Sequence, residues 1–209
     1  QSNDVRKTLK SIYHDKCAYC EQQIILPKKN TNKQAANSLT VEHFRPRATY
    51  YWLAYSWDNL LPVCYDCNHA KEDFFDIEGT EIKAIRADEI DNIHQLALIC
   101  NQEELPKFIH PELENFSAEF IYKKEGTVTS NNKRCQYVIE KCDLERSKLV
   151  LKRRKIIDDL KAKFKAIQTE EEFLKLAQEV KNKSKNPKTE FIALYHFILK
   201  NFNSIIVKS

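Results

Sequence analysis

Two Cys-x-x-Cys pairs constrain the fold of this chain more than any other feature of its sequence. The first pair is Cys17 and Cys20, and the second pair is Cys64 and Cys67. Thiolates are the ligands that zinc prefers, and four of them form a closed tetrahedral site. The spacing therefore predicts a structural Zn²⁺ ion, whose loss should unfold the surrounding region. A redox dithiol, which needs only one pair, and buried thiols paired by chance are the alternatives.

A carboxylate and an imidazole stand side by side inside the loop that this ion would close. Glu42 and His43 precede an Arg-Pro step at Arg45 and Pro46. An imidazole near its ordinary pKa can take a proton from water at neutral pH. Adjacent side chains on a strand point to opposite faces, so a twist or bulge is needed for both to meet one substrate. We interpret the pair as part of an active site.

Further polar residues follow this pair in an order that suits phosphate chemistry. Asn59 can hold the imidazole in its working tautomer, and Asn68 lies one helical turn before Lys71. A divalent ion on oxygen or nitrogen ligands can clamp a scissile phosphate. Arg45, Arg47 and Lys71 can neutralise phosphate charges. Taken singly, a histidine is more often a core residue and an asparagine a turn residue, so the ordered set carries the argument.

The ordered set resembles the HNH endonucleases, whose ββα-metal core is often stapled by four cysteines. The matching segments are CAYC at 17–20, VEHFRP at 41–46 and WDNLLPVCYDCNHAK at 57–71. The resemblance implies that His43 is the general base that activates water and that Asn59 orients it. It also implies that Glu42 is the acidic ligand of a catalytic Mg²⁺ or Mn²⁺ ion, although aspartate is commoner there.

The last part of the motif leaves a choice between two neighbouring residues. Asn68 matches a metal ligand that is His or Asn across these nucleases, and His69 is its alternative because it is adjacent. Lys71 matches a basic residue near the phosphate. The resemblance thus implies a hydrolase that cuts phosphodiester bonds, with DNA favoured as the substrate and RNA possible.

A narrower resemblance extends over most of the chain. VEHFRP, the aromatic run at 50–57 and a helical tail are similar to the small HNH nuclease of Septu-type anti-phage systems, which also occurs with some retrons. This resemblance implies a defence effector that works with a RecF/SMC-like ATPase partner. We expect the aromatic run to pack in the core beside the site; stacking on nucleic-acid bases is the alternative.

The composition favours a helix-rich α+β chain, because only two glycines occur among 209 residues. We expect a zinc-stapled ββα-metal nuclease core over residues 1–130, with a mixed extension from about residue 80. Residues 131–209 are predicted to be helical and to dock a partner or bind nucleic acid. Nine basic residues against two acidic ones lie between Arg146 and Lys165. That run either binds phosphates or is the solvated face of an amphipathic helix.

No apolar run approaches the ~18 residues of a membrane-spanning helix, and no signal peptide is visible, so we expect a cytoplasmic protein. Cys100, Cys135 and Cys142 lack paired spacing and are interpreted as buried thiols. The main alternative to a nuclease is a non-catalytic zinc module that binds nucleic acid or protein. It accounts for the four cysteines and the basic run. It does not account for the order of Glu42, His43, Asn59 and Asn68.

Overall fold

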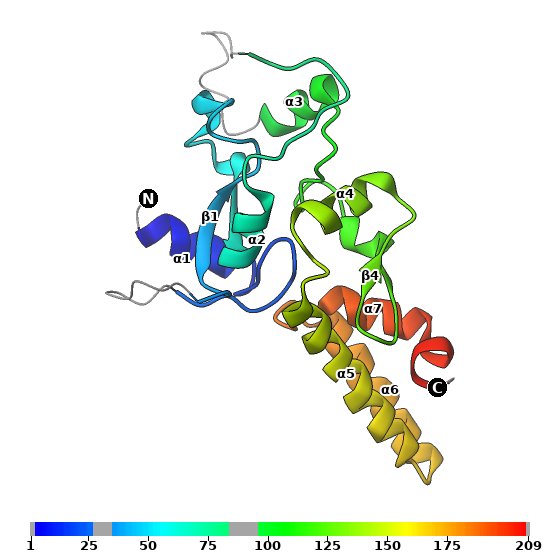
Figure 1. The fold of residues 1–209 in the computed structure, drawn as a ribbon. Helices are drawn as coiled ribbons and strands as arrows, with labels where there is room; N and C mark the ends of the chain where they lie inside the picture. Colours follow the sequence, from blue (N-terminus) through cyan, green and yellow to red (C-terminus); the bar gives the residue numbers. More distant parts are fainter. Residues whose placement is uncertain (1–2, 27–34, 84–95, 208–209) are drawn as a thin grey trace. The chain divides into compact units, whose positions relative to one another are not determined.

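The chain folds into two compact units. The computed structural model describes residues 3–26, 35–83 and 96–207. The N-terminal unit comprises residues 1–115 and the C-terminal unit residues 116–209 (Figure 1). Part of the extension expected from about residue 80 (residues 84–95) lies outside the described residues.

The N-terminal unit is built around a short antiparallel hairpin. Its elements are α1 (Asn3–Ile12), β1 (Leu39–His43), the 3₁₀ helices η1 (Tyr51–Leu53) and η2 (Trp57–Asn59), β2 (Leu60–Cys64), α2 (Tyr65–Lys71) and α3 (Leu96–Glu104). Strands β1 and β2 pair with Leu39 opposite Cys64 and His43 opposite Leu60. Helix α2 starts directly after β2, so the order β1–β2–α2 is the predicted ββα core.

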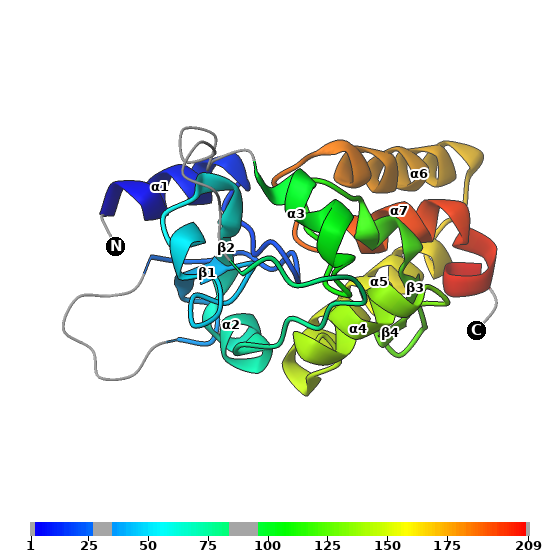
Figure 2. The same ribbon diagram turned by 90° about the horizontal axis from the view of Figure 1, so that it is seen from above.

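Two helices sandwich this hairpin. Helices α1 and α2 both contact both strands, and they lie on opposite sides of the hairpin in the two views (Figures 1 and 2). All five residues of β2 are buried, which fits their nearly continuous apolar sequence. Glu42 is the buried charged side chain of β1, and its partners Asn68 and Lys71 come from α2.

The C-terminal unit is mainly helical. Its elements are η4 (Phe116–Glu119), β3 (Ile121–Tyr122), β4 (Val128–Thr129), α4 (Lys133–Lys141), α5 (Ser147–Lys165), α6 (Glu170–Lys185), α7 (Ile192–Lys200) and the π-helical turn η5 (Asn203–Val207). Strand β3 contacts α7, and β4 contacts α4. This hairpin therefore belongs with the helices, and the units divide at residue 116 rather than near 131.

Gly126 forms the turn of the β3–β4 hairpin. Its φ is +85°, a conformation that L side chains adopt rarely. A Cβ at this position would lie 2.3 Å from the carbonyl oxygen of Val150. Glycine is therefore required here both for the turn and for the close approach of α5.

The basic run at 146–165 is largely used within the C-terminal unit. Arg153 is buried and donates to the carbonyl oxygens of Gly126 and Leu144 at 2.7 and 2.8 Å. Three further cations of the run pair with carboxylates, in the pairs Lys152–Glu190, Arg154–Asp158 and Lys163–Glu179. Much of the run is thus a solvated, internally paired helix face.

The aromatic run at 50–57 is divided between core and surface. Tyr50 and Leu53 are buried, as core packing predicts, whereas Tyr51 and Tyr55 are exposed.

The three cysteines outside the Cys-x-x-Cys pairs are buried, as predicted. They are Cys100, Cys135 and Cys142. Among the described residues, no helix is both long and apolar enough to cross a membrane.

Candidate active site beside a four-cysteine cluster

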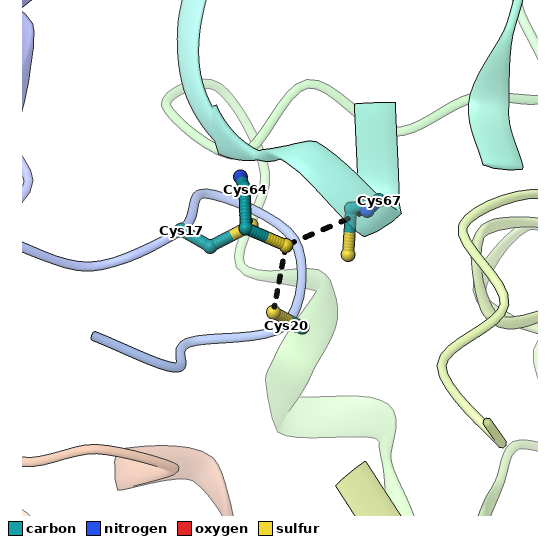
Figure 3. A group of neighbouring side chains, drawn as sticks. All are labelled: Cys17, Cys20, Cys64 and Cys67. Carbon is teal, nitrogen blue, oxygen red and sulfur yellow. Dashed lines mark hydrogen bonds between the residues drawn. The ribbon is translucent and has the colours of Figure 1, made fainter. Parts of the chain in front are cut away.

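The four paired cysteines form one buried cluster (Figure 3). The Sγ atoms of Cys17, Cys20, Cys64 and Cys67 all lie within 4.8 Å of one another. The Sγ atoms of Cys20 and Cys64 are 3.8 Å apart. A tetrahedral ion with Zn–S bonds of about 2.3 Å separates its sulfurs by about 3.8 Å. The donor set and its spacing fit zinc, so this four-cysteine cluster can hold that ion.

Main-chain donors already support the sulfurs of the four-cysteine cluster. The backbone N–H of Cys64 donates to Cys17 Sγ at 3.3 Å, and that of Cys67 donates to Cys64 Sγ at 3.4 Å. Burial raises the pKa of the Cys20 and Cys67 thiols. A bound metal ion reverses this effect, because a coordinating thiol is deprotonated outright. The four sulfurs are thus a ligand set that a bound cation would hold in the thiolate form.

A second cluster, of polar side chains, lies where the next turn of α2 meets β1. Lys71 Nζ is 2.7 Å from Glu42 Oε1, and Asn68 Nδ2 donates to Glu42 Oε2 at 2.5 Å. Asn68 and Lys71 share a helix face because they are three residues apart. Burial raises the pKa of Glu42, and the Lys71 ammonium opposes that rise. We call Glu42, Asn68 and Lys71 the polar cluster.

His69 lies on a different face of α2. It is exposed, and its ring is stacked on that of Tyr65, with centroids 5.9 Å apart and planes 7° from parallel. Asn68 is the residue in contact with Glu42. The geometry therefore brings Asn68, and not His69, to the acidic side chain of β1.

The His43 imidazole is held by one main-chain carbonyl. His43 Nε2 lies 3.0 Å from the carbonyl oxygen of Ala54. A carbonyl oxygen only accepts, so Nε2 carries the proton and Nδ1 is left as the acceptor. Burial lowers the pKa of His43, and the charges of Arg47 and Lys71 lower it further. With a pKa below its ordinary value of about 6.5, the ring is neutral at pH 7.

The Asn59 side chain makes its hydrogen bonds to the main chain at Arg45 and Leu53. The sequence led us to expect a contact with the His43 ring. Asn59 Oδ1 accepts from the Arg45 N–H at 2.7 Å. Its Nδ2 donates to the carbonyl oxygens of Arg45 and Leu53 at 3.2 and 3.3 Å. Leu53 adjoins Ala54, whose carbonyl holds His43. Asn59 thus joins the segment that follows the histidine to the segment that supplies its hydrogen-bond acceptor.

The three expected phosphate ligands occupy very different environments. Arg45 is 1% exposed, and its Nε is 2.8 Å from Glu104 Oε2. Lys71 is fully buried, and its Nζ also donates to the His43 carbonyl oxygen at 3.3 Å. Arg47 is exposed. The structure therefore uses Arg45 and Lys71 inside the unit, whereas Arg47 faces solvent and its charge acts on the His43 imidazole.

Three contributors to the site were not predicted from the sequence. The Ala54 carbonyl has no sequence signal, since any residue supplies one. Glu104 is 59 residues from its partner Arg45. His110 is buried, and its ring centroid is 4.6 Å from that of Phe44, next to His43 in sequence. None of these contacts leaves a local pattern in the chain.

Comparison with known protein families agrees with this geometry. Residues 17–74 match the family model described as HNH endonuclease. Residues 17–74 are an HNH endonuclease domain. The match begins at the first cysteine of the four-cysteine cluster and extends beyond the end of the polar cluster. This HNH domain places the chain among hydrolases of the nuclease type. The predicted helix-rich α+β class is confirmed, together with a four-cysteine group that could hold zinc.

Three relatives come from two Bacillus species. Septu protein PtuB of Bacillus mycoides (strain KBAB4) is 28% identical over 223 residues, which cover 97% of this chain and 70% of that protein. Septu protein PtuA of the same strain is 25% identical over 168 residues, 74% of this chain and 21% of PtuA. Septu protein PtuB of Bacillus thuringiensis is 34% identical over 67 residues, 32% of this chain and 23% of the relative. No solved structure matches the chain significantly.

Proposed function

We propose that this chain is a metal-dependent endonuclease in which His43 Nδ1 takes a proton from the attacking water. The observation that carries the proposal is the 3.0 Å contact between His43 Nε2 and the Ala54 carbonyl. This contact fixes the tautomer that leaves Nδ1 free to accept a proton. The lowered pKa of His43 keeps the ring in its basic form at neutral pH.

Glu42 and Asn68 are the oxygen ligands that would hold a catalytic Mg²⁺ or Mn²⁺ ion. Such an ion, when bound, neutralises charge on the scissile phosphate and on the leaving oxygen. Mg²⁺ typically takes one or two protein carboxylates and completes its coordination with water and substrate phosphate. Glu42 is the single carboxylate of this set and is already paired with Lys71. We infer that the ion binds firmly only together with the nucleic acid.

The remaining polar residues position these groups. Lys71 holds the Glu42 carboxylate in place, and Asn59 fixes the main chain on both sides of the imidazole. Arg47 is exposed beside His43, which suits a contact with a phosphate of the substrate. The four-cysteine cluster would hold Zn²⁺ and take no part in the reaction.

We further propose that the enzyme acts on DNA as an effector of an anti-phage defence system in the cytoplasm, together with an ATPase partner. The support is similarity over 97% of the chain to a protein named Septu protein PtuB. Part of the protein named Septu protein PtuA resembles this chain as well. The C-terminal helical unit is the proposed surface for the partner or for the nucleic acid.

The test is cleavage by the full chain in Mg²⁺ or Mn²⁺, with plasmid DNA and RNA as separate substrates. It is run with and without the product of any neighbouring ATPase gene. His43→Ala should cleave about 10²- to 10⁴-fold more slowly than the parent, because the general base is lost. His196→Ala, an exposed histidine on α7, is the matched control and should retain the parent rate. Equal rates for folded His43→Ala and the parent would refute the assignment of the base.

A further inference from the structure

The two most exposed large apolar side chains of the described residues lie in one short segment next to His43. Tyr55 is 88% exposed and Tyr51 is 70% exposed. The same segment buries Tyr50 and Leu53, which are 3% and 1% exposed. The segment therefore packs two residues into the unit and presents two rings to solvent; the Tyr51 ring also lies edge-on to Trp52, with centroids 5.1 Å apart.

These two rings come from the turn that holds the candidate base. Tyr55 directly follows Ala54, whose carbonyl oxygen is 3.0 Å from His43 Nε2. The Ala54 N–H donates to the Tyr51 carbonyl oxygen at 3.2 Å. Both residues are thus tied to Ala54, one by the chain and the other by a hydrogen bond.

Hydrogen bonds at Leu53 hold the backbone of this turn in place. Asn59 Nδ2 donates to the Leu53 carbonyl oxygen at 3.3 Å, and the Leu53 N–H donates to the Tyr50 carbonyl oxygen at 3.0 Å. A ring presented on an ordered backbone loses little conformational freedom when a ligand stacks on it. A tyrosine side chain has only two χ torsion angles that stacking must fix.

The charge beside this turn suits a nucleic acid. Arg47 is exposed, and its charge lies near enough to His43 to lower the pKa of the imidazole. An exposed cation together with exposed rings is the combination that binds single strands, in which the cation contacts the backbone and the rings stack on bases. A paired base in a duplex is already stacked on its neighbours and offers a ring no free face.

We propose that Tyr51 and Tyr55 form a stacking surface for unpaired bases beside the scissile phosphate. The substrate class is then a single-stranded or locally unpaired nucleic acid. The inference rests on the proposed nuclease function and specifies the form of its substrate. Stacking is tolerant of base identity, so unpaired DNA and unpaired RNA both fit the surface.

The test measures binding without cleavage. Full-length His43→Ala protein is titrated, without divalent metal, into fluorescently labelled single-stranded DNA, single-stranded RNA and duplex DNA of the same sequence. Adding Tyr51→Ala and Tyr55→Ala should weaken single-strand binding by at least about tenfold, since each stacked ring contributes about 5- to 150-fold. Duplex binding should change by less than about twofold, because paired bases do not stack on the rings.

Two control variants separate stacking from loss of structure. Tyr51→Phe with Tyr55→Phe keeps both rings and should bind single strands like the His43→Ala parent. Ile12→Ala removes an exposed apolar side chain from α1, to which no binding role is assigned, and should leave binding unchanged. Melting curves of the alanine variants should match the parent, because rings that are 70% and 88% exposed contribute little to the core.

Each other outcome contradicts the inference in a distinct way. Unchanged single-strand binding by the double alanine variant overturns it and leaves the nuclease function intact; the rings would then be free for a protein partner. An equal loss on single strands and duplex also overturns it, since a general loss of affinity is not stacking. A parent that binds none of the three oligonucleotides overturns this inference, whereas the proposed function fails only if the metal-supplemented chain does not cleave.

Discussion

Two adjacent residues of α2 carry side chains of opposite character. The first is Cys67, which is completely buried in the four-cysteine cluster. The next residue is Asn68, which is half-buried and contacts Glu42. Strands of five residues and a helix of seven are too short to be stable alone. The comparison teaches that a closed cation site can fix β1, β2 and α2 firmly. The residue next to a cysteine ligand can then contribute a half-buried side chain to the polar cluster.

Removal of a cysteine ligand should have the largest effect. Cys64→Ser is expected to unfold the N-terminal unit, because metal binding at such sites contributes about 10–16 kcal/mol in zinc-finger peptides. Zinc content by elemental analysis and hydrogen exchange of residues 1–115 would measure the loss. Cys142→Ala, a buried thiol of the other unit, is the control and should retain zinc. A folded Cys64→Ser protein with an unchanged core would show that the cluster is dispensable.

The buried ion pair behind the active site should have the next largest effect. Arg45→Met leaves the Glu104 carboxylate buried without its partner and should cost about 3–5 kcal/mol of unfolding free energy. Replacement of both residues by apolar ones, Arg45→Met with Glu104→Leu, should recover most of that loss. Denaturant unfolding of the full chain provides the measurement.

An exposed pair supplies the matched control for that experiment. Lys163 and Glu179 are 2.6 Å apart with side chains 52% and 41% exposed. Lys163→Met should change the unfolding free energy by no more than about 1 kcal/mol. Equal costs for Arg45→Met and Lys163→Met would mean that burial of the Arg45 pair has no energetic consequence.

The smallest expected effect is a shift in pH dependence. The Arg47 charge lowers the pKa of His43, so Arg47→Gln should raise that pKa. A general base works when it is neutral, so cleavage rises as pH increases through its pKa, and the variant should reach its plateau at a higher pH. Profiles of kcat/KM between about pH 5 and pH 8 report this shift in the free enzyme. Lys148→Gln, an exposed lysine of α5, should leave the profile unchanged; a shift toward lower pH in Arg47→Gln would contradict the assigned cause.

Sequence reasoning predicted the features of this fold that local spacing determines. The cysteine spacing predicted the cluster, and the ββα order that the family resemblance implied was also correct. The environments of Arg45 and Lys71 could not be predicted. An arginine or a lysine can be either an exposed phosphate ligand or a buried ion-pair partner, and the sequence does not distinguish the two roles. Their partners come from β1 and α3, and only the folded chain brings them together.

The residues of the candidate site remain a prediction from the sequence, and the contacts that they make could not be predicted. Asn59 was expected at the imidazole, yet its hydrogen bonds reach the main chain at Arg45 and Leu53. The group that does contact the imidazole is the Ala54 carbonyl. A main-chain acceptor carries no residue signature, so no sequence pattern could have named it.

The adjacent residues Asn68 and His69 provide the most direct test of the account. Asn68→Ala and His69→Ala are compared for zinc content, unfolding free energy and cleavage on the same preparations. Both should retain the zinc of the parent and lose no more than about 1–2 kcal/mol of stability. Only Asn68→Ala should lose cleavage, by about 10²-fold or more, because a ligand to the catalytic ion is removed. Loss of zinc from Asn68→Ala, or a cleavage defect confined to His69→Ala, would contradict the account. In that account α2 gives Cys67 to the structural site and Asn68 to the catalytic site.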